Sequence, residues 1–257
     1  MNQDMFDLTG RVALITASSR GIGLGIAEAM AARGASVVIS SRKAEACDEA
    51  AGKITQAGGD ALAVPCNVGH KDQLEALVAA TMARWGRIDI VVCNAGINPY
   101  YGPLAEITDE AFDKTMATNV RSTLWLCNMV LPGMAARGGG AALLVASIAG
   151  LRGSAKMGSY GISKAAEMGM TRHLAVEWGP SNVRVNCIAP GVIRTSFARV
   201  LYDDPEMSEP LIAATPMGRI GEADDIAGAA VYLCSDAARF VTGQVLVIDG
   251  GRLIATG

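Results

Sequence analysis

Short apolar runs alternate with longer segments of helical periodicity along almost the whole chain, and this alternation restricts the possible folds most strongly. The runs are rich in Val and Ile and are nearly continuous in hydrophobicity, without regular polar positions. Such a run predicts a strand that is buried on both faces, as in a parallel sheet. Seven strands are predicted in this way, at residues 11–16, 35–40, 61–65, 88–93, 141–147, 183–189 and 244–248.

The segments between these runs carry Ala, Leu and Met at helical spacing. They predict helices at residues 21–33, 44–56, 72–85, 109 to about 134, 160–178 and 224–234. Alternation of strands with helices favours a parallel sheet with helices on both faces. We therefore expect one α/β domain over residues 1–257, with a Rossmann-type, doubly wound sheet of seven parallel strands.

Residues 194–221 interrupt this alternation. The segment is polar and acidic, and it contains Pro205, Pro210 and Pro216. A long irregular connection in a compact domain is often a mobile cover over a binding site. We therefore predict that residues 194–221 form a substrate lid.

The charge pattern argues against nucleic acid or a membrane as a partner. The chain has 22 Lys and Arg against 25 Asp and Glu, and the basic residues are scattered. A nucleic-acid or membrane surface would require basic clusters, and a spanning helix would require an apolar run of about 18 residues. The first ten residues also lack the basic start of a signal peptide. We therefore expect a cytoplasmic protein.

The spacing of the cysteines and histidines does not indicate a metal site or a disulfide bond. The six cysteines never lie within four residues of one another, and the two histidines, His70 and His173, are far apart. Zinc and redox motifs need closely spaced ligands, so we predict buried free thiols and no metal site.

A loop of small residues, TASSRGIG at 16–23, connects the first predicted strand to the first predicted helix. This arrangement presents backbone N–H groups and a positive helix end to a pyrophosphate. Ala17 stands where the related pattern TGxxxGxG has glycine, and we expect a negative φ there. Small residues at such a turn also serve close packing, so the loop alone leaves both roles open.

The end of the second predicted strand bears on the choice of cofactor. It reads Ser40, Ser41, Arg42 and Lys43, without the carboxylate that binds the ribose 2′-hydroxyl in NAD-dependent Rossmann proteins. Arg42 could pair with a 2′-phosphate, with Arg20 in the neighbouring loop. The sequence therefore favours NADP(H) over NAD(H), although basic residues at a solvated strand end have the same pattern.

Tyr160 and Lys164 are four residues apart in a predicted helix and so share one face. The helix follows the strand that ends at Ser147, and open α/β sheets bind ligands at the carboxyl ends of their strands. A nearby ammonium lowers the pKa of a phenol toward neutral pH, and a serine hydroxyl can donate a hydrogen bond to a carbonyl oxygen. We therefore predict that Tyr160 transfers a proton while a nicotinamide cofactor transfers a hydride.

In this order the motifs resemble the short-chain dehydrogenase/reductase family. The resemblance rests on TASSRGIG, CNAG at 93–96, Asn119 within MATNV, Ser147, Tyr160 with Lys164, and PGVIRT at 190–195. SSRK at 40–43, CNVGHKDQ at 66–73, NAGINPYYGPL at 94–104 and RTSFARVL at 194–201 are similar to NADP-dependent carbonyl and retinal reductases of the dehydrogenase/reductase member 4 type. The resemblance implies an oxidoreductase that transfers a hydride between NADP(H) and a ketone or aldehyde, or a secondary alcohol.

The resemblance also implies a role for each matching residue. The catalytic set would be Asn119, Ser147, Tyr160 and Lys164, with Tyr160 as the general acid or base and the Asn119 backbone holding a water; a purely structural role for Asn119 remains open. The cofactor-binding set would be Ser18, Ser19, Arg20, Gly21, Ile22, Gly23, Ser41, Arg42, Asn67, Val68, Asn94, Ala95, Gly96, Tyr160, Lys164, Pro190, Gly191, Ile193 and Thr195. The substrate would contact Ile97, Asn98, Tyr100, Tyr101, Ser196, Phe197 and Leu201.

Two alternative functions are also considered. A 3-oxoacyl thioester reductase of the same family would meet an acidic carrier protein with basic side chains, and WGPSN at 178–182 has none. A dinucleotide-binding regulator without catalysis would not need the four catalytic residues together. The resemblance further implies a homotetramer built by helices 109–135 and 160–178 and the last strand. The terminal ATG differs from a peroxisomal SKL signal.

Overall fold

The computed structural model describes residues 4–255, and its centre is a sheet of seven parallel strands. The strands are β1 (Val12–Thr16), β2 (Ser36–Ser40), β3 (Asp60–Ala63), β4 (Ile90–Cys93), β5 (Gly140–Val145), β6 (Val183–Pro190) and β7 (Val245–Ile248). Their spatial order is β3-β2-β1-β4-β5-β6-β7, so the chain winds outward from β1 first in one direction and then in the other. The predicted doubly wound, seven-stranded parallel sheet is confirmed.

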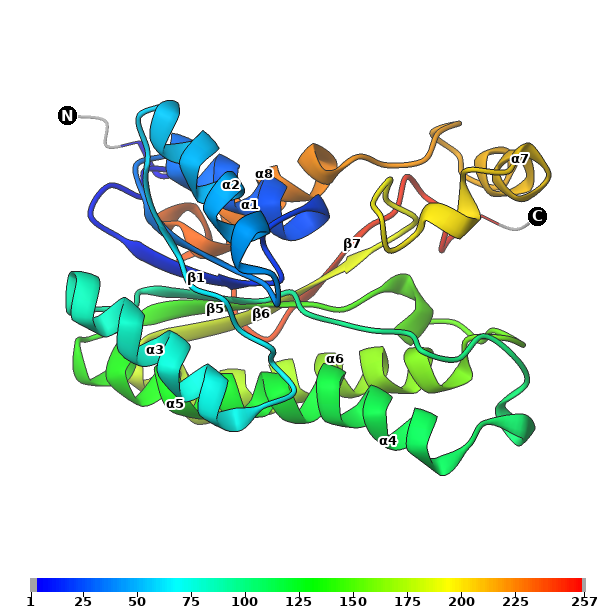
Figure 1. Ribbon diagram of the computed structural model, residues 1–257, viewed down its shortest axis with the longest axis horizontal. Coiled ribbons are helices and arrows are strands. Elements are labelled where there is room, and N and C mark those ends of the chain that lie inside the picture. Colours follow the sequence, from blue (N-terminus) through cyan, green and yellow to red (C-terminus); the bar gives the residue numbers. More distant parts are fainter. Residues whose placement is uncertain (1–3, 256–257) are drawn as a thin grey trace.

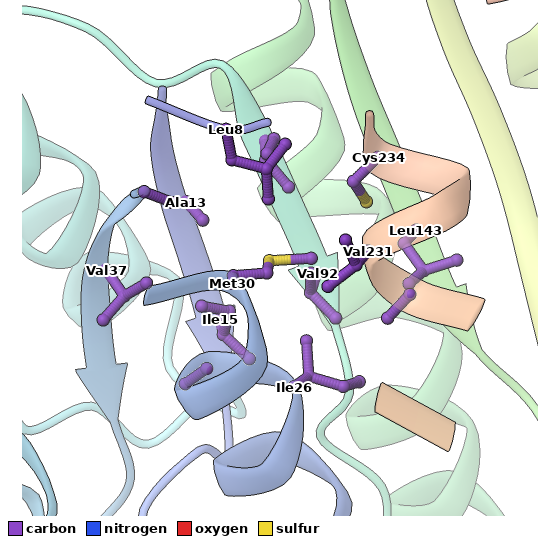
Figure 2. Packing of buried hydrophobic residues seen from close by; sticks show 14 of the residues in the cluster. Leu8, Ala13, Ile15, Ile26, Met30, Val37, Val92, Leu143, Val231 and Cys234 are labelled. Atoms are coloured by element: carbon purple, nitrogen blue, oxygen red, sulfur yellow. The ribbon is translucent and has the colours of Figure 1, made fainter. Parts of the chain in front are cut away.

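Helices cover both faces of the sheet (Figure 1). One face carries α1 (Gly21–Ala32), α2 (Ala44–Gln56) and α8 (Ala223–Cys234), and the other carries α3 (Lys71–Trp85), α4 (Asp109–Met116), α5 (Ser122–Ala136) and α6 (Gly158–Trp178). Ala13 and Ile15 of β1 pack on the first face, and Leu14 packs on the second. Figure 2 shows the first of these cores, where Ile26 and Met30 of α1 share a cluster with β-strand residues. Burial on both faces explains why the strands read as continuous apolar runs.

The predicted helix at 109–134 is interrupted in the structure. α4 ends at Met116, a π-helical turn occupies Ala117–Arg121, and α5 begins at Ser122. The buried residue of this turn is Asn119. A π-turn inside a helix is often found at a functional site, because it changes the direction in which one side chain points.

The predicted lid at residues 194–221 contains a helix that the sequence pattern did not indicate. α7 spans Pro205–Ala213 and follows a 3-10 turn at Arg199–Leu201. Pro205 takes the first helical position, where its missing N–H is no disadvantage, and the Asp204 carboxylate accepts a hydrogen bond from the Glu206 N–H at 3.0 Å. In Figure 1 α7 lies beyond the carboxyl ends of the strands, far from the N-terminus.

All six cysteines are buried and unpaired, as the sequence predicted. Burial raises the pKa of Cys66 to about 11 and those of Cys187 and Cys234 to about 12. These thiols therefore stay protonated and act as small apolar side chains.

Among residues 4–255, no helix is both long enough and apolar enough to cross a membrane.

Candidate active site

Most residues singled out in the sequence lie on loops that leave the carboxyl ends of β1, β2, β3, β4, β5 and β6, whereas Asn119 lies in the π-turn and Tyr160 and Lys164 lie on α6. Parallel pairing aligns these ends: Ile15 lies opposite Val92, Cys93 opposite Leu144, and Val145 opposite Ile188. The loops therefore meet at one edge of the sheet, which is where a doubly wound fold binds its ligands.

The small-residue loop after β1 makes a left-handed turn at Ala17, which has a φ of 52°. The expectation of a negative φ at this alanine is wrong. The Asn94 side-chain amide donates to the carbonyls of Thr16 and Ala17 at 3.0 and 3.1 Å, and these two bonds hold the turn in place. A left-handed residue other than glycine costs about 1–2 kcal/mol, so the bonds to Asn94 help to maintain a strained loop.

Gly23 allows this loop to pack closely against the start of α1. A methyl group at Gly23 would lie 2.5 Å from the Asn94 side-chain nitrogen and 2.6 Å from the Ala17 carbonyl oxygen. These contacts are too short for any other residue. Gly23 thus brings the first turn of α1 directly beneath the loop.

The first turn of α1 is open to an anion. Arg20 precedes the helix and provides no side-chain hydrogen bond to it, so the amides of Gly21 and Ile22 have no side-chain cap. Ser19 and Arg20 flank this turn. Ser18 is different, because its N–H and its hydroxyl already pair with β1 and β2. Ser18 therefore shapes the loop, and the helix N-terminus supplies the donors for a phosphate.

Arg42 is exposed at the end of β2, and within residues 4–255 neither Arg42 nor Arg20 forms an ion pair. The Ser41 N–H donates a hydrogen bond to the Cys47 sulfur at 3.1 Å, which holds Ser41 in place. Asn67 accepts from the Gly69 N–H and so keeps its side-chain NH₂ group available, with Val68 beside it. Two free guanidinium groups next to an open helix N-terminus can bind a phosphorylated ligand.

The loops after β4 and β6 complete the same edge. Ala95 donates its N–H to Thr16 at 3.2 Å, and the Lys164 ammonium lies against Gly96, where a methyl group would be 3.2 Å from Nζ. Pro190 ends β6, Gly191 packs against Asp249, and Ile193 is buried. Thr195 lies next to the phosphate loop, since a methyl group on Gly21 would be 3.0 Å from its Cγ2.

Asn119 connects the π-turn to the loop after β4. Its side-chain oxygen accepts from the Ile97 N–H at 2.8 Å, and its NH₂ group donates to the Ile97 carbonyl at 3.0 Å and to the Ser163 hydroxyl at 2.9 Å. The side chain thereby satisfies buried backbone groups, which is the structural role left open by the sequence. The same bonds tie the substrate side of the edge to α6.

Tyr160 is buried on α6, with the Ser147 side chain near its hydroxyl. Burial raises the pKa of Tyr160 above its usual value. The charge of Lys164 and the hydrogen bond with Ser147 lower this pKa, and the charge of Glu167 raises it. The prediction that Lys164 brings the pKa of Tyr160 toward neutral pH is not met, because desolvation of the phenolate outweighs its attraction to Lys164.

Lys164 is 2% exposed, and its Nζ lies 5.6 Å from the centre of the Tyr160 ring. The ammonium donates to the Val145 carbonyl and to the Glu167 carboxylate, both at 2.9 Å. Sequence reasoning missed Glu167. The sequence does contain a signal for this ion pair, because Glu167 follows Lys164 by three residues and therefore lies on the same face of α6.

The residues expected to contact a substrate differ in the contacts that their side chains already make. The Phe197 ring lies 5.9 Å from the Tyr160 ring, and in the predicted lid Ser196 precedes Phe197 and Leu201 follows it. The Tyr100 hydroxyl instead donates to the Pro103 carbonyl, and Tyr101 lies under the Lys156 ammonium. Ile97 and Asn98 lie on the loop after β4. Within residues 4–255 the buried side-chain oxygen of Asn98 has no hydrogen-bond partner.

Comparisons with known proteins match this chain over almost its full length. A family model described as enoyl-(acyl carrier protein) reductase matches residues 16–252. "Dehydrogenase/reductase SDR family member 4" of Bos taurus is 43% identical over 246 residues, which cover 96% of this chain and 88% of that protein.

Solved structures agree in fold. A 7α-hydroxysteroid dehydrogenase complexed with NADH and 7-oxo glycochenodeoxycholic acid has a TM-score of 0.94 and 38% identity, covering 98% of this chain and 97% of that chain. A gluconate 5-dehydrogenase from Burkholderia cenocepacia, in complex with NADP and tartrate, also has a TM-score of 0.94, with 35% identity, 98% coverage of this chain and 99% of that chain.

Proposed function

The chain belongs to the short-chain dehydrogenase/reductase family, and on this basis we propose that it transfers a hydride between NADP(H) and a ketone or aldehyde, or a secondary alcohol. One observation carries the proposal: Tyr160, Ser147 and Lys164 lie together at the sheet edge that also carries the uncapped N-terminus of α1. Proton-transfer groups and a phosphate-binding turn at one edge match what such a reaction requires.

The chain's own residues orient the carbonyl and move the proton. Ser147 donates a hydrogen bond to the carbonyl oxygen as negative charge develops on it, and Tyr160 delivers the proton in reduction or removes it in oxidation. Lys164 places its positive charge near the phenol and has one N–H left after its bonds to Val145 and Glu167. The nicotinamide cofactor, when bound, supplies or accepts the hydride. Its positive ring in the oxidised form also favours the phenolate.

The exposed Arg42 and the neighbouring Arg20 support NADP(H) as the preferred cofactor. A guanidinium forms two parallel hydrogen bonds with a phosphate, and no carboxylate stands at the end of β2 to repel it. The gluconate 5-dehydrogenase structure contains NADP, whereas the hydroxysteroid dehydrogenase structure contains NADH. Both cofactors therefore occur in structures similar to this one.

We expect Arg42→Ala to weaken NADPH binding about 10- to 100-fold, since a hydrogen-bonded charge pair contributes about 1.5–3 kcal/mol. NADH binding should change by less than about threefold, because NADH has no 2′-phosphate. Titration calorimetry of both cofactors checks this. Arg33→Ala removes an equal charge at the far end of α1 and serves as the matched control. Equal losses for NADPH and NADH would remove Arg42 from the 2′-phosphate site.

An apolar substrate body fits the surroundings of Tyr160. Phe197 presents an exposed ring beside Tyr160, and Leu201 follows on the same lid. The unpartnered side-chain oxygen of Asn98 offers one polar contact. Binding sites for small ligands combine such an apolar wall with few polar groups.

A substrate screen with both cofactors tests the proposed function. We expect purified protein to oxidise NADPH in the presence of some ketones or aldehydes from a panel of increasing hydrophobic size. The decrease in NADPH absorbance measures the rate. Stereochemical analysis of each product then identifies the face of the carbonyl that is attacked. Cofactor binding without turnover on any compound of the panel would favour the dinucleotide-binding regulator.

We also propose that the chain assembles as a homotetramer. Apolar side chains are exposed on the elements that would form its interfaces: Leu124 on α5, Ile162 and Val176 on α6, and Leu246 on β7. Exposed apolar side chains that recur on a few elements are typical of subunit contacts.

A further inference from the structure

Glu167 is a buried acid that the proposed reaction does not use. It is 1% exposed and lies on α6, one turn beyond Lys164, between the sheet and the helix layer. Its Oε2 accepts the hydrogen bond from the Lys164 ammonium at 2.9 Å, and its Oε1 has no hydrogen-bond partner. A buried carboxylate oxygen without a partner is energetically unfavourable, so such a group calls for a functional explanation.

Lys164 is the cation that balances Glu167. The other titratable groups nearby are the Tyr160 hydroxyl and the thiols of Cys93 on β4 and Cys187 on β6. Burial raises the pKa of Cys187 to about 12, and a hydrogen bond with Cys127, together with burial, raises that of Cys93. Both thiols are therefore neutral. The groups that can carry charge in this buried region are therefore three side chains that follow one another along α6: the phenol of Tyr160, the ammonium of Lys164 and the carboxyl of Glu167.

We propose that Glu167 is a positioning residue of the catalytic set, which holds the Lys164 ammonium at the end of β5 and offsets its charge, and thereby limits how strongly Lys164 favours the ionised form of Tyr160. The proposal rests on the proposed role of Tyr160 as the acid or base. It extends the catalytic pair to a row of three residues on one helix face.

The geometry gives Glu167 two effects on Lys164. Together with the Val145 carbonyl, it fixes two of the three ammonium N–H groups and leaves the third for the cofactor side. It also keeps the ammonium charged: burial lowers the pKa of Lys164, but the charge and hydrogen bond of Glu167, with the charge of Tyr160, raise it overall.

The charge state of Glu167 changes near neutral pH. Burial raises the pKa of Glu167 to about 7, although the charge of Lys164 lowers it. Below this pH the carboxyl is neutral, and the full charge of Lys164 acts on Tyr160. Above it the carboxylate cancels part of that charge, and the pKa of Tyr160 rises. Glu167 therefore opposes the ionisation of Tyr160 as the pH increases.

Glu167→Gln separates the charge from the position. The amide has nearly the same shape, and its oxygen still accepts a hydrogen bond from Lys164, so only the negative charge is lost. In alcohol oxidation with NADP⁺, which needs ionised Tyr160, we expect the acidic limb of the kcat/KM profile to move to lower pH. At about pH 8 the variant should be about 3- to 10-fold faster than the natural chain. The high-pH plateau should change by less than about twofold.

Two further measurements complete the test. Glu177→Gln makes the same change at an exposed position of α6 and should leave the profile unchanged. Infrared spectroscopy of the cofactor-free protein should show a protonated carboxyl band that disappears as the pH passes about 7 and is missing in Glu167→Gln. This band does not depend on catalysis.

A Glu167→Gln profile that coincides with that of the natural chain, or moves to higher pH, overturns the proposal. So does the absence of a carboxyl that titrates near pH 7. If no alcohol is oxidised at all, or if Tyr160→Phe retains activity, the proposed function fails instead. In that case the infrared band still decides whether Glu167 is a neutral-range acid paired with Lys164.

Discussion

Tyr160→Phe is expected to lower kcat about a thousandfold while the protein still binds NADPH. The substitution removes one hydroxyl and keeps the ring that packs beside Phe197, so the fold and the walls of the site should persist. Positioned acid–base groups contribute about 10²- to 10⁴-fold to catalysis, and this hydroxyl is the proposed proton donor and acceptor. Steady-state rates with the best ketone of the screen, together with NADPH binding measured by calorimetry, check the result.

The control for this prediction is Tyr232→Phe. Tyr232 lies on α8, on the other side of the sheet from α6, and should be replaceable without loss of activity. The residual rate of Tyr160→Phe should also lose its dependence on pH, because the titrating group is gone. Retention of more than about a tenth of the natural rate would assign the proton transfer to a different group.

Ser147→Ala is expected to lower kcat about 10²- to 10³-fold, which is the usual effect of removing one donor that stabilises a developing oxyanion. KM for NADPH should stay nearly constant, since Ser147 is assigned to the carbonyl substrate. The Ser147 hydroxyl also accepts a hydrogen bond from the Ala149 N–H at 3.1 Å, at the start of a short 3-10 turn. We therefore expect a loss of about 1 kcal/mol in unfolding free energy as well.

Thermal unfolding and kinetics together separate these two effects. Ser147→Thr keeps a hydroxyl and should recover part of the activity, whereas Ser154→Ala, in the exposed loop after this turn, should change neither quantity noticeably. If Ser147→Ala lost stability but kept its kcat, Ser147 would be a capping residue only.

The sheet was predictable because burial on both faces leaves a direct trace in the sequence. The central strands β1, β4, β5 and β6 lie between two helical layers, so nearly every position in them must be apolar. The sequence does not predict α7, because its segment is polar and contains Pro205 and Pro210. Pro205 instead starts the helix, where proline is favoured. Local composition does not distinguish a proline that begins a helix from one that ends it.

Contacts between distant segments account for what the sequence could not indicate at the site. The left-handed conformation of Ala17 depends on hydrogen bonds from Asn94, 77 residues away. The π-turn contains Asn119, whose side chain pairs with Ile97. Glu167 had a local signal, its spacing from Lys164, but its burial and unpaired oxygen become visible only when the helix packs on the sheet. Residue types and spacing thus indicate candidate chemistry, and tertiary contacts determine its geometry.

The burial of all six cysteines has a practical consequence for experiments on this protein. A thiolate must reach the electrophilic label to attack it, so the buried native cysteines should give little background reaction. A single cysteine introduced at an exposed position of the segment around α7 can then carry a fluorophore without first removing the natural ones. The fluorescence of such a label would test whether the predicted lid opens and closes during turnover in an otherwise unaltered chain.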